Sequence, residues 1–184
     1  IRKYKPKDEI KNYHRHEYVQ INYVNKGSGY HTINNKKIPI SKGDIFIIPP
    51  YIPHTILSNE NGSLEIFEFE FKTDFVVPIE INLEDAESYL DYAYLEPFMV
   101  IEENVNPRFN LNESLQKEVE KILYEVLDEY KNKYSGYILV ARALLLKLLV
   151  IVGRAYAGTI KGTETEIVIG KFKKIIYSSN LEAL

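Results

Sequence analysis

The stretch of sequence that decides the fold is Tyr13–Gln20, which reads YHRHEYVQ. In an extended strand, side chains two positions apart point to the same face, so His14, His16 and Gln20 are expected to line one surface. Tyr18 has the same parity and adds an aromatic ring to that surface. Imidazole groups bind metals or polar molecules, and aromatic faces line small-molecule pockets. The stretch therefore predicts one wall of a binding site.

A second stretch, Gly43–His54, reads GDIFIIPPYIPH and brings another histidine to the start of a different strand. Its apolar run, Asp44–Ile48, predicts a short strand that ends at the two prolines after it. We expect His54 to meet the first two histidines in one cavity. The remaining histidine, His31, has no comparable spacing and is expected at the surface.

Short strands are expected on either side of these two stretches. β-Branched and aromatic runs are broken by Gly, Asn and Pro at intervals of about eight to twelve residues, which is typical of a sandwich or barrel. The expected strands are Tyr13–Val24, Tyr30–Ile33, Lys37–Ile40, Asp44–Ile48, His54–Ser58 and Leu64–Phe71. In the last strand, Phe67 is expected on the inner face as part of the ligand-binding set, and Glu65 shares its parity.

The second half of the chain is expected to be helical. All eight prolines lie at or before Pro107, and proline breaks helix interiors. From Leu115 onward, apolar residues follow the spacing of an amphipathic helix, predicted at 113–134 with Asn110 as its cap. A second helix, at 137–157, is apolar nearly all round. We predict that the two helices pack as an antiparallel pair.

The second helix also predicts a homodimer. A helix that is apolar on every face must be buried on every face, and one flank of a barrel cannot cover all of it. A second copy of the chain would supply the missing cover, since twofold dimers are the commonest assembly. The residues predicted at this interface are Leu144, Leu145, Leu148, Leu149 and Ile151.

The composition excludes several classes of protein. A chain of 184 residues with 45% hydrophobic and 27% charged residues is typical of one globular domain. The absence of cysteine excludes disulfides and thiol nucleophiles, and a net charge of −3 gives no whole-chain footprint for nucleic acid. Charged residues interrupt the most apolar segment, so no membrane span is predicted and a cytoplasmic location is expected.

Two spacings in the chain resemble the motifs of the cupin family. They are His14-x-His16-x-x-x-Gln20 followed by Gly27, and Gly43 followed by Pro49 and His54. In metal-binding cupins the matching positions carry two histidines, a glutamate and a third histidine on the inner wall of a small β-barrel. The resemblance implies that His14, His16, Gln20 and His54 are the ligands if a divalent transition metal is bound. Because Gln20 is neutral where glutamate is usual, we expect weak metal binding or none.

The wider pattern is similar to the sensor half of AraC-type transcription regulators. The similarity covers about residues 10–155 and includes the Gly43–His54 wording and Phe71 at the end of the last strand. It implies a mainly β fold, with a cupin-like β-barrel followed by the helix pair. The implied division is a barrel with an N-terminal arm at 1–108, a helical dimerisation segment at 109–160, and a linker or the start of a DNA-binding region at 161–184.

The resemblance implies a bacterial regulator that binds a small-molecule effector, such as a sugar, and is not an enzyme. It implies contact with DNA only through a region absent from this chain. The alternative is a cupin metalloenzyme of the isomerase or dioxygenase type, which needs a metal with an open coordination position and a nearby acid or base. Inner-wall carboxylates are scarce in the predicted barrel, with Glu65 as the candidate, and this argues against the enzyme. A dimeric storage or scaffold protein is a third interpretation.

Overall fold

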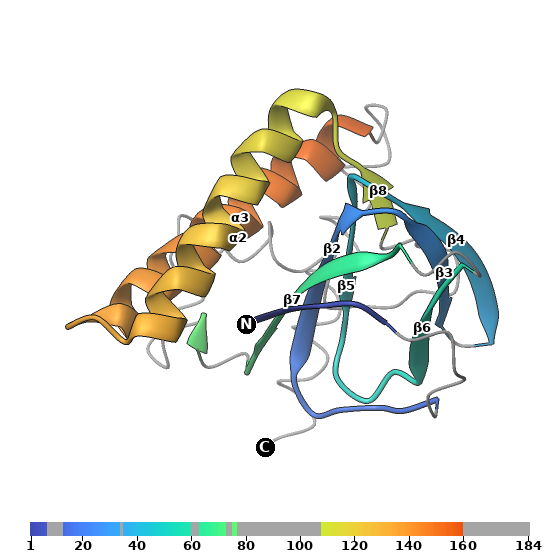
Figure 1. Cartoon of the computed structure of the whole chain (residues 1–184), viewed down its shortest axis with the longest axis horizontal. Helices are drawn as coiled ribbons and strands as arrows, with labels where there is room; N and C mark the ends of the chain where they lie inside the picture. The colour runs from blue at the N-terminus through green and yellow to red at the C-terminus, as the bar shows by residue number, and fades with distance from the viewer. Residues whose placement is uncertain (7–12, 34, 60–62, 73–74, 77–107, 160–184) are drawn as a thin grey trace, which may run out of the picture.

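The computed structural model describes residues 1–6, 13–33, 35–59, 63–72, 75–76 and 108–159, which form two β-sheets and a helix pair (Figure 1). The strands are β1 (Arg2–Tyr4), β2 (Val19–Lys26), β3 (Ser28–Ile33), β4 (Lys36–Ser41), β5 (Asp44–Ile48), β6 (His54–Ser58), β7 (Glu65–Phe71) and β8 (Arg108–Asn110). The helices are α2 (Glu113–Asn132) and α3 (Tyr137–Thr159). This arrangement confirms the predicted class, mainly β with C-terminal helices.

Antiparallel pairing joins the strands within each sheet. The larger sheet has the order β1-β7-β2-β5-β8, and the smaller has the order β4-β3-β6. Strands β3 and β4 form the predicted hairpin, and Asn35 in its turn has a φ of 63°, a left-handed conformation that asparagine tolerates. Strands β5 and β6 have the predicted bounds.

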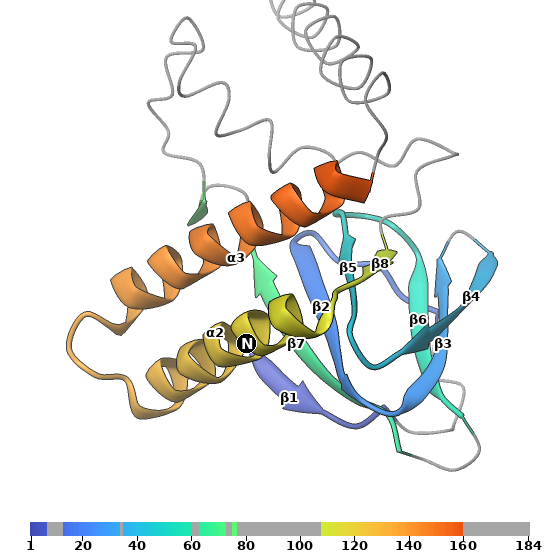
Figure 2. The same cartoon turned by 90° about the horizontal axis from the view of Figure 1, so that it is seen from above.

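The helices cover the face of the five-stranded sheet that points away from the smaller sheet (Figures 1 and 2). The apolar side chains therefore form two separate cores. One lies between the sheet and the helices and includes Ile21, Tyr23, Phe67, Val119, Ile122, Leu145 and Leu148. The other lies between the two sheets and includes Val24, Ile40, Phe46, Ile48, Leu64 and Ile66.

Strand β2 is the wall shared by the two cores. Its side chains alternate, so Ile21 and Tyr23 pack toward the helices while Gln20, Asn22 and Val24 point between the sheets. Both faces are buried, which is why the strand shows no simple alternation of apolar and polar residues. A change on one face of β2 is thus transmitted directly to the helix side through the same backbone.

The first predicted strand is too long at its N-terminal end. Regular pairing of β2 begins at Val19, and His14 forms an isolated antiparallel bridge to His54. Residues 17 and 18 form a bend between the bridge and the strand. The histidines therefore converge because backbone bonds tie them to the β5–β6 connection, and shared parity in one continuous strand was the wrong reason.

The helices begin and end close to the predicted positions, but the predicted cap is wrong. Asn112 is the N-cap of α2, and its side chain accepts a hydrogen bond from the backbone N–H of Leu115 at 3.0 Å. Asn110 instead ends β8 and donates to the carboxylate of Asp44 at 3.0 Å. Of the described helices, none is long and apolar enough to cross a bilayer.

Candidate ligand-binding site

Two segments far apart in the sequence are pinned together at the open end of the interior between the sheets. The backbone N–H of His14 donates to the His54 carbonyl at 3.1 Å, and the His54 N–H donates back at 2.9 Å. The N–H of Tyr51 donates to the His16 carbonyl at 2.7 Å. These three bonds hold the His-rich segment against the proline-rich turn, so the imidazoles meet.

Three predicted histidines form a contiguous cluster of rings. The ring of His54 lies 4.5 Å from that of His14 and 4.9 Å from that of His16, measured between centroids. The rings of His14 and His16 are 6.3 Å apart. Tyr18 stacks on His16 with a centroid distance of 4.2 Å and nearly parallel planes. The predicted convergence of these four side chains is therefore correct.

The fourth histidine, His31, was expected at the surface, and this expectation is wrong. His31 is 2% exposed, stacks on Phe46 at 4.5 Å, and lies 6.1 Å from the ring of His54. Its position on β3 alternates inward because Gly29 and Ile33 share its face. Burial, reinforced by the neighbouring His54, lowers the pKa of His31 to about 3. The cluster therefore contains four imidazoles.

The cluster continues into a buried polar network on β2 and β7. The side-chain amide of Gln20 donates to Asn22 at 3.1 Å and to the Glu68 carboxylate at 2.9 Å. Arg2 on β1 forms an ion pair with the other oxygen of Glu68. Gln20 and Glu68 are 3% and 2% exposed. Burial raises the pKa of Glu68, and the hydrogen bond from Arg2 opposes that effect.

Glu68 replaces Phe67 in the site, and the predicted face of β7 is wrong. The register pairs Asn22 with Glu68 and Tyr23 with Phe67, so Glu68 points between the sheets. Phe67 instead packs in the helix-side core, with its ring 4.8 Å from that of Tyr124. The predicted inner carboxylate, Glu65, shares the outer face and pairs with Lys3 at 2.8 Å. Alternation along β7 was visible in the sequence, but which face turned inward depended on a register that it did not reveal.

Glu70 and Tyr18 form the rim of the site. The Tyr18 hydroxyl donates to the Glu70 carboxylate at 3.0 Å, and Arg2 also lies within 3.9 Å of that carboxylate. Desolvation and the nearby Glu70 raise the pKa of Tyr18 to about 12, so its hydroxyl stays protonated. The rim is thus a neutral hydroxyl held by a carboxylate, above a stacked imidazole.

Four buried nitrogen atoms in this region have no hydrogen-bond partner among the described residues. They are Nε2 of His16, His31 and His54 and Nδ2 of Asn22. A buried polar group without a partner costs on the order of 1–3 kcal/mol, and such groups are rare in native proteins. Their concentration in one place marks a site that something else completes.

The donor set does not fit a metal centre as it is placed. Within the described parts of the chain, no group of three His, Asp or Glu side chains is arranged to hold one ion. Gln20, which stands where the cupin motif has glutamate, directs its amide nitrogen to Asn22 and Glu68. The carboxylate that might ligate in its place, Glu68, is held by Arg2 and Gln20.

The predicted dimer residues lie in two different environments on α3. Leu145, Leu148 and Leu149 are at most 3% exposed, because the α2 helix and the sheet cover them within one chain. The argument that they require a second copy is therefore wrong. Leu144 and Ile151 are half-buried at the edge of the same core. The exposed apolar residues near them are Ile138, Leu139 and Leu146.

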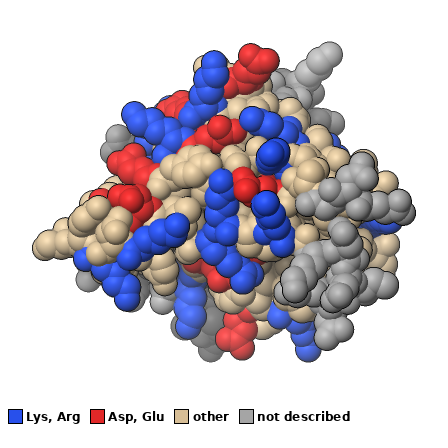
Figure 3. Space-filling view, in the orientation of Figure 1, with Lys and Arg blue, Asp and Glu red and all other residues tan. Residues whose placement is uncertain are grey.

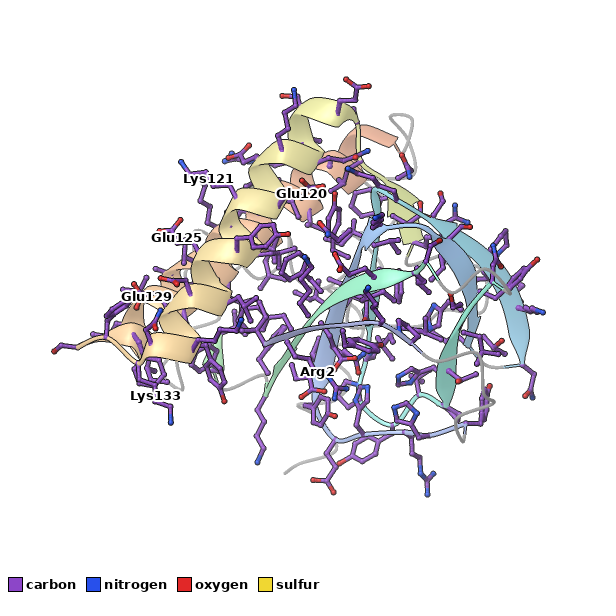
Figure 4. The ribbon with its side chains drawn as sticks, viewed as in Figure 1. Arg2, Glu120, Lys121, Glu125, Glu129 and Lys133 are labelled. Atoms are coloured by element: carbon purple, nitrogen blue, oxygen red, sulfur yellow. The ribbon has the colours of Figure 1, made fainter. Side chains whose placement is uncertain are left out.

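The charged surface gives no clear indication of a single macromolecular partner. On the face shown in Figure 3, lysine and arginine side chains are interspersed with aspartate and glutamate. On α2, Lys121 and Glu125 point to solvent, whereas Glu120 points toward the strands (Figure 4). There Glu120 accepts a hydrogen bond from the Tyr23 hydroxyl at 2.8 Å. The polar interior is the more distinctive feature of the molecule.

Several solved structures are similar to this chain. The AraC-like transcriptional activator CuxR covers 73% of this chain and 42% of its own length at 9% identity, with a TM-score of 0.43. ToxT from Vibrio cholerae covers 66% of this chain and 46% of its own length at 11% identity, with a TM-score of 0.46. KdgF from Halomonas sp. covers 33% and 57% at 34% identity, with a TM-score of 0.29.

Sequence comparison gives a more definite result. An uncharacterized protein of Methanocaldococcus jannaschii is 40% identical over 47 residues, which is 26% of this chain and 38% of that protein. This chain therefore matches well under half the length of that relative. The family model described as the AraC-like ligand binding domain matches residues 1–149, which include both sheets, the histidine cluster and most of α3. On this match, the chain belongs to the family of AraC-like ligand binding domains.

Proposed function

We propose that this chain is the effector-binding and dimerisation part of a transcription regulator. Membership of the AraC-like ligand binding family supports it. The observation that carries the proposal is the group of four unpartnered nitrogens on His16, His31, His54 and Asn22, buried between the sheets. A small molecule bound there would satisfy groups that the folded chain leaves unpaired.

The proposed effector site consists of the interior polar residues. They are His14, His16, Tyr18, Gln20, Asn22, His31, His54 and Glu68. Small-molecule sites combine apolar walls with a few convergent polar groups, and the apolar core between the sheets would supply the walls here. Phe67 is left out because its ring packs against α2.

The proposed route from effector to output runs through β2. Gln20 and Asn22 face the site, while Tyr23 on the opposite face donates to Glu120 of α2 at 2.8 Å. An effector changes the helix side only if it binds two arrangements of this wall with different affinity. We propose that the regulator contacts DNA through a separate region, consistent with the division at 1–108, 109–160 and 161–184.

We propose that dimerisation uses the exposed side of α3. Leu139 is 71% exposed, and Ile138 and Leu146 are 45% and 38% exposed. Fully burying one such side chain stabilises an assembly by roughly 1.5–3 kcal/mol. A groove beside Leu146, lined also by Leu115, Val150 and Ile151, continues the apolar surface. Twofold pairing of α3 helices would cover it.

The enzyme alternative is not supported by the geometry of its acid–base group. Glu68 is the buried carboxylate beside the imidazoles, but its two oxygens are occupied by Arg2 and Gln20. A general acid or base must be free to reach the proton it transfers. We therefore propose a binding function and no catalytic one.

The experiment is a thermal-unfolding screen of the purified chain against small molecules that include polyols, sugars, amines, carboxylates and fatty acids. A true effector at a concentration about 100 times its Kd stabilises the folded chain by about 2.7 kcal/mol. For a domain of this size that raises the Tm by roughly 5–10 °C. If no compound of any class raises the Tm, the proposed function is wrong.

A further inference from the structure

His54 is held with one ring nitrogen tied to the backbone. Its Nδ1 lies 2.9 Å from the carbonyl oxygen of Ile52. A carbonyl oxygen can only accept, so Nδ1 must carry the proton, and a neutral imidazole has one N–H. Nε2 of His54 is therefore a bare lone pair. That atom has no partner among the described residues, and the side chain is 1% exposed.

His16 is fixed in the same way. Its Nδ1 lies 2.7 Å from the carbonyl oxygen of Tyr18, and stacking on the Tyr18 ring holds its plane. Nε2 of His16 is the second unpartnered lone pair, on a side chain that is 7% exposed. The two rings are 4.9 Å apart. The site thus presents two hydrogen-bond acceptors whose tautomers are set by the backbone.

Both imidazoles remain uncharged at neutral pH. Burial lowers the pKa of His54 to about 4, and the hydrogen bond to Ile52 only partly opposes it. Burial also lowers the pKa of His16, against the opposing effect of the Tyr18 carbonyl. His14 and His16 add to the lowering at His54, because two nearby imidazoles disfavour a third positive charge.

The remaining groups of the cluster define what else the ligand must satisfy. Nδ2 of Asn22 is a donor without a partner among the described residues. The carboxylate of Glu68 is already neutralised by Arg2 and bonded to Gln20. The cluster therefore offers two acceptors and one donor and no unpaired charge.

A hydroxyl group is the chemical group that completes this set. It donates to an imidazole lone pair and accepts from an amide N–H in one contact. A carboxylate can only accept, so it would place negative oxygens against two lone pairs. An ammonium group can only donate, and it would bring an unpaired charge into a buried site. The three groups are thus distinguished by the hydrogen positions that the backbone imposes.

We propose that the effector is a neutral ligand bearing several hydroxyl groups, which donates hydrogen bonds to Nε2 of His16 and of His54. Carboxylate-headed ligands are rejected by the same two atoms. This inference rests on the proposed effector-binding function and specifies the ligand class for it. His16 and His54 are then the specificity-determining residues of the site.

The tautomers can be tested without a ligand. Long-range ¹H–¹⁵N NMR of the histidine-labelled chain at neutral pH distinguishes Nδ1–H from Nε2–H imidazoles. We expect the Nδ1–H pattern for both His16 and His54. An Nε2–H pattern for either residue would overturn the proposal and would leave the effector-binding function standing.

The ligand class is tested with matched pairs that differ by one oxidation state at one carbon. The probes are glucitol and gluconate, xylitol and xylonate, and glycerol and glycerate, titrated into the same sample. We expect a polyol to bind, to shift both Nε2 resonances, and to bind at least about tenfold more tightly than its acid partner. Equal or tighter binding of the acids, or no binding by any polyol, would overturn the proposal.

Variants identify the atoms responsible. His54→Asn keeps an amide N–H for the Ile52 carbonyl but removes the inward acceptor, so polyol affinity should fall about tenfold with little loss of folding. Arg15→Ala, at an exposed position between the two histidines, is the matched control and should leave affinity unchanged. Polyol binding that is insensitive to His54→Asn would overturn the assignment.

Zn²⁺ added alone separates an organic ligand from a metal. Binding of one Zn²⁺ per chain that shifts both Nε2 resonances and blocks the polyol would overturn the proposal, because the lone pairs would then serve an ion. Stabilisation by fatty acids with no response to polyols would also overturn it, while supporting the effector-binding function. If no compound of either kind stabilises the chain, both proposals are wrong.

Discussion

Gln20 and Glu68 face each other across the β2–β7 pair, with the amide nitrogen of Gln20 2.9 Å from a carboxylate oxygen of Glu68. The interior keeps one carboxylate, but it stands on β7 and a neutral amide occupies the position where the cupin motif has glutamate. The amide bridges Glu68 to Asn22 at 3.1 Å. The departure from the motif at Gln20 is therefore compensated by a neighbour on the adjacent strand.

Gln20→Glu should destabilise the folded chain at neutral pH. The substitution puts a second carboxylate beside Glu68, and each raises the pKa of the other. A raised pKa in the folded state means that stability is present at low pH and lost as pH rises. We expect a loss of about 1–3 kcal/mol at pH 7 that shrinks as pH falls toward about 4, measured by urea unfolding at both pH values.

The same variant should bind Zn²⁺ more tightly than the native chain, because a cation relieves the repulsion between the two carboxylates. Zn²⁺ is expected to raise the Tm of Gln20→Glu more than that of the native chain. Gln20→Met is the control, since it removes the amide without adding charge. Stoichiometric transition metal in the purified native chain would contradict the weak metal binding predicted here.

The native chain should lose stability in acid through its buried histidines. The folded pKa of His54 is about 4 and that of His31 about 3, both below the ordinary value of 6.5. The unfolded chain therefore takes up protons first, and stability falls as pH drops from about 6.5 toward about 4. His31→Phe keeps a ring against Phe46 and should make that decline shallower.

The measurement is the free energy of urea unfolding at pH 7, 6, 5 and 4. A slope in this range that is identical in the native chain and in His31→Phe would contradict the burial of His31 as an uncharged ring.

The sequence predicted the strand order and the meeting of the histidines better than it predicted which side chains face inward. Strands β3 to β6 have recognisable turn residues, so their positions follow from local chemistry. The inward face of β7 depends on pairing with β2, and a slip of one residue exchanges Phe67 for Glu68. Burial of His31 likewise depends on contacts with β5 and β6, which no local pattern encodes.

The residue usually replaced by glycine in the second motif predicts a stabilising exchange. Tyr51 has a φ of 65°, a left-handed conformation that costs an ordinary residue roughly 1–2 kcal/mol. Its side chain is 62% exposed, so little burial is lost on substitution. Tyr51→Asn should stabilise the chain by about 0.5–1 kcal/mol, since asparagine tolerates this conformation.

Gly43→Ala is the opposing control for this measurement. Gly43 has a φ of 87°, and an added Cβ would lie 2.3 Å from the side-chain nitrogen of Gln116. We expect a loss of about 1–3 kcal/mol in the free energy of unfolding. Equal effects of the two exchanges would contradict the backbone conformations described for this turn.

The dimer proposal predicts different consequences for neighbouring leucines on α3. Leu146→Asp changes an exposed residue and should convert the dimer to a folded monomer with little change in Tm measured on the monomer. Leu145→Asp places a charge where the side chain is 0% exposed, so it should unfold the chain at a cost of several kcal/mol.

Sedimentation equilibrium at micromolar concentration measures the first effect, and circular dichroism measures the second. A native chain that sediments as a monomer, with no change in Leu146→Asp or Leu139→Asp, would remove the dimer from the account.

The central claim is that the effector lies between the two sheets against the histidine cluster. The most direct measurement is a crystal structure of the chain with the compound that raises its Tm most in the screen. The account predicts ligand density within hydrogen-bonding distance of Nε2 of His54, bounded by Gln20 and Asn22. Density in the groove beside Leu146, with the interior unchanged, would contradict it.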